Sequence, residues 1–364
     1  MGSLAQSHIP VLDGLRAVSV FTVMVYHFGF ARVPGDLGVS TFFVLSGFLI
    51  TWLLLKEDRE TGRVSLTGFY TRRVLRIFPA YYAFLALSFV IDHLRHHPWS
   101  PALRNSAIFY VVNYFNAIHG DHHTSVAHAW SLAIEEQFYV LWPLAFLLLR
   151  RQGGRVTVRV LVWMIATVAI WRSVAFLLIG TSPTYVYNAF ETRFDNLAIG
   201  CLLALLLERG YLERALNATA RLSWLPLLTI GLLVISRMLM PASYHYSAGF
   251  TVDAALIAVL IVQILQHHHQ RLWSWLELPT VRYLGTISYP LYLYHPWGLG
   301  AARQLHGLPV GVQFIAGCLI CVAVASGSYF IVERPFLRLK RHIGAGRTER
   351  VLRVTRLEPP EATA

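Results

Sequence analysis

Residues 11–31 read VLDGLRAVSVFTVMVYHFGFA, an apolar run interrupted by Asp13, Arg16 and His27. A helix needs about 20 mostly apolar residues to cross the hydrocarbon core of a bilayer. No basic region precedes this run, and no small-residue cleavage site follows it. We therefore expect the first membrane-spanning helix here rather than a cleaved signal peptide.

The composition of the whole chain agrees with this expectation. The 364 residues are 55% apolar and 14% charged, with a mean hydropathy of +0.51, whereas an ordinary soluble domain is about 45–50% apolar and about 25% charged. Such a chain cannot cover a globule with polar surface, which excludes a soluble enzyme, a disordered protein and a secreted disulfide scaffold. We expect one all-α polytopic membrane domain over residues 1–345 and a short polar cytoplasmic tail at 346–364.

Apolar runs along the chain predict a transmembrane helical bundle of about ten spans. The segment 102–135 is ambiguous, because its apolar run at 108–118 is short and contains Asn113 and Asn116. We expect that segment to be re-entrant or interfacial. The ten candidate spans lie near residues 11–31, 36–55, 78–95, 136–150, 157–179, 194–208, 222–240, 250–266, 284–304 and 311–332.

Arginine and lysine residues decide the predicted orientation. With ten spans and the N-terminus inside, the inner loops and the inner tail carry most of them, and the outer loops hold scattered arginines only. This pattern follows the positive-inside rule and predicts that both termini are cytoplasmic. The formal net charge of +12 then needs no nucleic-acid partner, because these residues set the topology and contact anionic lipid headgroups.

Ionisable residues within a span suggest function, because lipid makes them costly. Arg16 and His27 are 11 residues apart, a rotation of roughly 20° from complete helical turns and a rise of about 16 Å, so both face one side of the first helix. A groove on that face would suit an extended ligand with its anionic end near the cytoplasm. The alternative is that Arg16 snorkels to the interface and His27 is hydrogen-bonded within the bundle.

Two further features lie in the second span and the first inner loop. Arg73 and Arg76 are neighbours at i, i+3 if that segment is helical, and paired guanidinium groups suit phosphate oxygens. These arginines are also explained by topology alone. Ser46 and Gly47 are small residues among large ones; helix packing explains Gly47, and Ser46 lacks the flanking glycines of a serine-hydrolase elbow.

The later spans carry further candidates. Glu135 and Glu136 are expected at the mouth of an apolar helix, where two acids exceed what capping requires. His295 lies mid-span between two prolines, where a kink is expected. Arg193 and Asp195 open the sixth span and would simply pair with each other, and Glu333 closes the tenth span, where an interfacial position explains it.

Three groups of histidines suggest metal binding at first sight. None of them forms a helical i, i+4 pair accompanied by a catalytic acid, so we expect solvated loops and no metal site. The groups are His93, His96 and His97; His119, His122, His123 and His128; and His267, His268 and His269.

Taken together, these segments resemble the acyltransferase-3 family of integral membrane acyltransferases, which O-acylate bacterial surface sugars. The similarity runs from about residue 8 to residue 340, and it is the order of seven individually weak motifs that is specific. The motifs are LDGLR at 12–16 with His27; GVS at 38–40 with FFVLSGFLI at 42–50; RRVLRIFP at 72–79; WSL at 130–132 with Glu135, Gln137, Phe138 and Tyr139; Arg193 with Asp195; Ser288 and Tyr289 with His295; and Glu333-Arg334-Pro335.

The resemblance implies transfer of an acyl group, most often acetyl, from cytoplasmic acyl-coenzyme A in a bacterial inner membrane. The acceptor would be a hydroxyl of a carbohydrate, a glycolipid or a glycosylated small molecule, and no bound cofactor is expected. His27 would act as general base, with an acyl-histidine intermediate as an alternative, and Glu135 would orient His27 or bind acceptor hydroxyls. Substrate-binding roles would fall to Arg16, Arg73, Arg76, Ser46, Arg193, Asp195, His295 and Glu333.

A second class of function fits the same buried charges. A proton-coupled transporter or flippase of acyl groups or lipid-linked sugars would also need ionisable residues in its spans. The lack of a visible internal repeat and the phosphate-type arginine pair argue against it.

Overall fold

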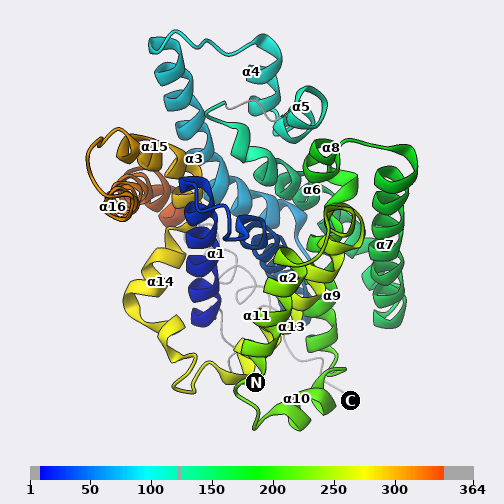
Figure 1. The fold of residues 1–364 in the computed structure, drawn as a ribbon. Helices are drawn as coiled ribbons and strands as arrows, with labels where there is room; N and C mark the ends of the chain where they lie inside the picture. The colour runs from blue at the N-terminus through cyan, green and yellow to red at the C-terminus, as the bar shows by residue number, and fades with distance from the viewer. Residues whose placement is uncertain (1–8, 121–123, 340–364) are drawn as a thin grey trace, which may run out of the picture.

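The computed structural model describes residues 9–120 and 124–339, and within these two ranges the chain is helical without any β-strand (Figure 1). Each of the ten predicted spans contains a helix. Their bounds are α1 (Pro10–Phe28), α2 (Gly35–Thr61), α3 (Leu66–Leu94), α6 (Trp130–Arg150), α7 (Gly154–Val174), α9 (Asp195–Glu208), α11 (Leu225–Met238), α13 (Phe250–His267), α15 (Ser288–Arg303) and α16 (Val310–Ser328).

Seven helical segments in the described ranges are long and apolar enough to cross a bilayer. By contrast, α9 and α11 have 14 residues each and α15 has 16, so they rise about 21–24 Å against a hydrocarbon core of about 30 Å. The all-helical membrane fold is therefore confirmed, whereas ten crossings and cytoplasmic termini stay predictions. The seven segments are Pro10–Phe28, Gly35–Thr61, Leu66–Leu94, Ala127–Arg150, Gly154–Ile179, Ala242–His267 and Val310–Leu339.

Short helices connect the long ones. The ambiguous segment forms α4 (Pro101–Ile108) and α5 (Val112–His119), each of eight residues and too short to span, which agrees with the expectation that no eleventh span lies there. These two helices gather at one end of the molecule and α10 (Glu213–Thr219) at the other (Figure 1). The remaining short helices are α8 (Pro183–Asn188), α12 (Ala242–Tyr244) and α14 (Pro279–Thr286).

Three predicted boundaries are wrong in ways that affect the site. Helix α3 begins at Leu66, where Ser65 caps it by accepting a hydrogen bond from the Gly68 N–H, so the arginine-rich segment is helical. Helix α6 begins at Trp130, which puts the two glutamates inside the helix rather than at its mouth. The predicted span 284–304 breaks at Ile287 into α14 and α15.

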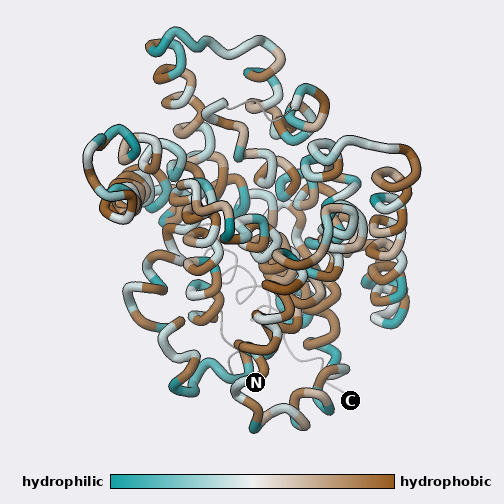
Figure 2. The backbone as a smooth tube through the Cα atoms, viewed as in Figure 1, coloured by the Kyte–Doolittle hydropathy of each residue, from teal (hydrophilic) through white to brown (hydrophobic). Residues whose placement is uncertain are grey.

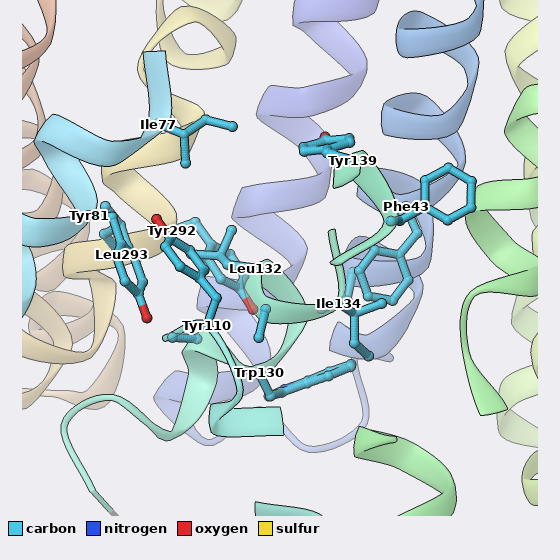
Figure 3. Packing of buried hydrophobic residues seen from close by; sticks show 14 of the residues in the cluster. Phe43, Ile77, Tyr81, Tyr110, Trp130, Leu132, Ile134, Tyr139, Tyr292 and Leu293 are labelled. Carbon is cyan, nitrogen blue, oxygen red and sulfur yellow. The ribbon is translucent and has the colours of Figure 1, made fainter. Parts of the chain in front are cut away.

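Helix α2 lies at the centre of the bundle, packed against α1, α6, α9 and α13. Its closest approach is to α9, where a Cβ atom at Gly47 would overlap the carbonyl oxygen of Leu197, and one at Gly200 would overlap that of Val44. Small residues thus let the two backbones meet, as expected for Gly47. Figure 3 shows part of the buried cluster beside this contact, including Phe43, Trp130 and Tyr292.

The outward faces of the peripheral helices are apolar. Trp163 on α7 is 72% exposed and Leu319 on α16 is 66% exposed, and apolar segments run along the lengths of the helices in Figure 2. Contiguous exposed apolar surface of this kind is costly in water and favourable in lipid. The chain is therefore a multi-pass membrane protein.

Candidate functional site

A cavity of about 610 Å³ opens between α1, α2, α3, α6 and α15. This volume lies within the usual range for small-molecule sites, about 300–1,000 Å³. Five of the residues that the sequence singled out line it together, although they come from four helices. They are Arg16 on α1, Ser46 on α2, Arg73 and Arg76 on α3, and Glu135 on α6.

Helix α3 brings two guanidinium groups to the cavity. Because α3 is continuous here, Arg73 and Arg76 lie one turn apart on one face, and both line the cavity. The Arg73 guanidinium carbon lies 4.3 Å from the centre of the Tyr139 ring, a cation–π distance. Arg76 lies within electrostatic range of Arg16, so the three arginines form one positive region on the cavity wall.

Glu135 lines the same cavity and lies within electrostatic range of Arg73 and Arg16. Its Oε1 atom accepts a hydrogen bond of 3.0 Å from the Ser46 hydroxyl, and its Oε2 atom accepts one of 3.3 Å from the Tyr139 hydroxyl. Ser46 thus positions a carboxylate, a contact that sequence spacing could not reveal across 89 residues. The neighbouring Glu136 also lines the cavity.

A pair of histidines lies outside the cavity lining. The Nδ1 atom of His27 lies 2.9 Å from the Nε2 atom of His295, and the His295 side chain is fully buried. Arg303 donates a hydrogen bond of 2.6 Å to the backbone carbonyl of His27, one of the last carbonyls of α1, which have no partner within the helix. Helix α15 therefore holds both the ring and the backbone of His27.

Tyr292 connects the histidine pair to the cavity. Its hydroxyl lies 2.7 Å from that of Ser131, and both residues line the cavity. Its backbone carbonyl accepts a hydrogen bond of 2.7 Å from Nδ1 of His295. Arg16 thus lines the cavity, whereas His27 does not and is linked to the cavity wall by contacts through His295 and Tyr292.

His128 joins this group, although the sequence suggested a solvated loop for it. It is 8% exposed, its Nε2 atom lies 3.0 Å from the Leu293 carbonyl oxygen, and its ring centre lies 5.2 Å from that of His295. The sequence did offer a signal that His128 is buried, because it lies two residues before Trp130, where an apolar helix begins.

The other histidines divide between exposed and buried positions. His93, His96 and His97 are exposed as expected, His122 and His123 lie outside the described residues, and His267 and His268 are buried, contrary to the expectation. Ligand atoms of His268, His269 and Glu277 lie within 4.8 Å of one another. Burial lowers the pKa of His268. The Oε1 atom of Glu277 lies 3.1 Å from Nδ1 of His268, and its charge opposes this shift.

Arg193 and Asp195 are fully buried and lie outside the cavity lining. The expected pairing between them is wrong, because Asp195 accepts a hydrogen bond of 3.0 Å from Arg172 and one of 2.5 Å from Thr251. Arg193 instead lies with its guanidinium carbon 3.7 Å from the centre of the Phe250 ring. The sequence offered a signal for the missed Arg172, namely a charge inside a predicted span.

Glu333 departs from the interfacial position expected for it. It is 4% exposed at the end of the π-helical turn Tyr329–Glu333 that follows α16. It lies within electrostatic range of Arg76, which lines the cavity. Glu333 therefore belongs to the surroundings of the arginine region rather than to the membrane surface.

Comparison with known proteins places the chain in a family. Residues 9–331 match the family model described as an acyltransferase domain. The chain is 30% identical over 313 residues to the peptidoglycan O-acetyltransferase OatA of Listeria monocytogenes, covering 80% of this chain and 49% of that protein. It is also 30% identical over 349 residues to the putative peptidoglycan O-acetyltransferase YrhL of Bacillus subtilis, covering 90% of this chain and 55% of the relative.

The chain is likewise 30% identical over 356 residues to a putative O-acetyltransferase of Staphylococcus aureus. This match covers 90% of this chain and 57% of the relative. The chain thus spans about half the length of the curated relatives it matches. No solved structure matches it significantly. The family match extends over nearly the whole chain and favours an enzyme over a transporter, so the chain belongs to the acyltransferase-3 family of integral membrane acyltransferases.

Proposed function

We propose that this protein transfers an acyl group, acetyl in the first instance, from cytoplasmic acyl-coenzyme A to a hydroxyl of a carbohydrate acceptor at a bacterial inner membrane. The observation that carries the proposal is a cavity with arginines on its wall and with Tyr292 in its lining, whose backbone carbonyl contacts His295 of the histidine pair. The names of the relatives support an acceptor of the peptidoglycan class, either the glycan itself or a lipid-linked precursor.

The cavity suits the chemistry of the donor. Coenzyme A carries phosphates at one end and a thioester at the other, and guanidinium groups bind phosphate oxygens well. Arg73, Arg76 and Arg16 would hold the phosphates, while the uncharged arm extends along Phe42, Phe43 and Leu132. The thioester would then lie near Ser131 and Tyr292, at the end of the cavity nearest the histidines.

His27 is the proposed general base. It would take the proton of the acceptor hydroxyl while the hydroxyl oxygen attacks the thioester carbonyl carbon. A carbon–oxygen ester bond forms, the carbon–sulfur bond breaks, and the proton passes from His27 to the leaving thiolate. No further reactant is needed.

Glu135 acts in the cavity in this proposal. Its hydrogen bonds to Ser46 and Tyr139 favour substrate binding over a role in orienting His27. Arg193 and Asp195 would support the fold around the outer half of the site, since their contacts are to Phe250, Arg172 and Thr251.

The test is transfer by purified protein in lipid nanodiscs, using radiolabelled acetyl-coenzyme A and peptidoglycan-derived oligosaccharides. Labelled ester that is released by mild alkali would support the proposal. Arg155, an exposed arginine at the start of α7 that does not line the cavity, provides a control substitution for the cavity arginines. Labelled ester that forms equally in the wild type and in Arg73→Ala would contradict the proposal.

A further inference from the structure

A proline in α15 leaves one backbone carbonyl of the site without its helical partner. In an α-helix the N–H of residue i donates to the carbonyl of residue i−4. Pro296 lies inside α15 and has no N–H, so the carbonyl of Tyr292 cannot be satisfied in the usual way. Buried carbonyls require a partner, and this one is near the end of the cavity.

The ring of His295 supplies that partner. Its Nδ1 atom lies 2.7 Å from the Tyr292 carbonyl oxygen. A carbonyl oxygen can only accept, so Nδ1 must carry the hydrogen. In a neutral imidazole the other nitrogen is then an acceptor, and Nε2 of His295 is the atom that faces His27.

The same reasoning fixes the proton on His27. Because Nε2 of His295 accepts, Nδ1 of His27 must donate across the 2.9 Å contact. The lone pair of a neutral His27 is then on its Nε2 atom. A histidine acts as a base only at the nitrogen that carries no proton, so this tautomer decides which atom of His27 can react.

We infer that His295 is a positioning residue, which holds His27 in the Nδ1–H tautomer and thereby makes Nε2 of His27 the basic atom. The inference rests on the proposed role of His27 and goes beyond it. When Nε2 of His27 takes the acceptor proton, its Nδ1–H still donates to His295. The proton then leaves from Nε2 to the thiolate, and His295 gains and loses nothing.

The tautomer itself can be observed without turnover. In protein labelled with ¹⁵N-histidine, a nitrogen with a proton and one with a lone pair have well-separated shifts, and subtraction of the His27→Asn spectrum isolates His27. We expect Nδ1–H in the wild type and a mixture of both tautomers in His295→Leu. His306→Gln, at an exposed histidine after α15, serves as the labelling control. Predominant Nε2–H at His27 in the wild type would overturn the inference.

Kinetics separate positioning from mere packing. His295→Leu removes the acceptor and is expected to lower kcat by at least about 100-fold, with the KM for the donor unchanged because His295 does not line the cavity. In His295→Gln the amide oxygen can still accept from His27, so we expect activity within about tenfold of the wild type. Equal losses in the Leu and Gln variants, with both proteins folded, would contradict the inference.

Pro296→Ala provides a test that leaves both histidines in place. It restores an N–H that competes for the Tyr292 carbonyl, so we expect kcat to fall on the order of tenfold although the helix itself becomes more regular. Pro279→Ala is the matched control, because Pro279 is at the first position of α14, where no helical hydrogen bond is lost. Full activity of Pro296→Ala with an unchanged tautomer would overturn the claim that the carbonyl left free by Pro296 holds the ring of His295.

The failure of this inference is distinguishable from failure of the proposed function. A fully active His27→Ala variant would remove the general base, whatever the tautomer. An inactive His27→Ala variant together with a wild-type Nε2–H tautomer would leave the base in place and refute the role of His295.

Discussion

The Nδ1 atom of His27 lies 2.9 Å from Nε2 of His295, although 268 residues separate them in the sequence. His27 lies near the end of α1 and His295 in the middle of α15. Arg303 of α15 also donates a hydrogen bond to the backbone carbonyl of His27. The end of α1 that carries His27 is thus held by contacts with α15.

His27→Ala is expected to lower the transfer rate by about 10²–10⁴-fold, the usual effect of losing a general base. The fold should persist, because His27 is exposed in the structure. Turnover and size-exclusion behaviour in detergent measure the two effects, with His306→Ala as a control at another exposed histidine. Near-normal turnover of the purified variant would rule out His27 as the base.

The double substitution Arg73→Ala with Arg76→Ala should weaken donor binding, because it removes two of the four arginines that line the cavity. We expect the KM for acetyl-coenzyme A to rise at least tenfold, the equivalent of about 1.4 kcal/mol, and its dependence on ionic strength to become shallower. Arg155→Ala should leave both unchanged. Identical donor affinity in the double variant and the wild type would mean that these arginines set topology only.

Arg172→Ala should destabilise the protein without acting on the substrates. The Arg172–Asp195 pair is fully buried, and removing one member of such a pair costs about 3–5 kcal/mol. Thermal unfolding in detergent measures this loss. Replacing both members, as Arg172→Met with Asp195→Leu, should recover part of it, and a double variant as unstable as Arg172→Ala would argue against the pair as the cause.

Gly47→Ala should also destabilise the bundle, because the added methyl group would overlap the carbonyl oxygen of Leu197. Overpacking of this kind typically costs about 1–3 kcal/mol. Gly231→Ala is the matched control, since nothing lies within 4 Å of a Cβ atom there. A stability of Gly47→Ala equal to that of Gly231→Ala would mean that α2 and α9 do not depend on this contact.

The sequence predicted the helices well, because apolar runs and charged loops are local signals. It placed a helix in each of the ten predicted spans and rejected a further span at 102–120, where the structure has the eight-residue helices α4 and α5. It also singled out Arg73 and Arg76 of the cavity wall, since paired guanidinium groups at i, i+3 are visible in the chain itself.

The partners of the charged residues were harder to predict, because they depend on packing between distant helices. Adjacency in the chain suggested that Asp195 pairs with Arg193. The packing of α7 against α9 instead makes Arg172 the hydrogen-bond partner of Asp195. Likewise the sequence shows that His295 lies between two prolines, but its partner His27 follows from the packing of α1 on α15.

The account as a whole depends on a donor that enters from the cytoplasm and an acceptor that approaches from the other side. The positive-inside pattern predicts that Arg73 and Arg76 lie near the cytoplasm, and acyl-coenzyme A is too highly charged to cross a bilayer unaided.

The most direct test uses protein sealed in vesicles of known orientation, with labelled acetyl-coenzyme A and the oligosaccharide acceptor placed on chosen sides. The account predicts labelled product when the donor is at the cytoplasmic face and the acceptor at the opposite face. Product that forms only when both substrates are on the cytoplasmic side would contradict it.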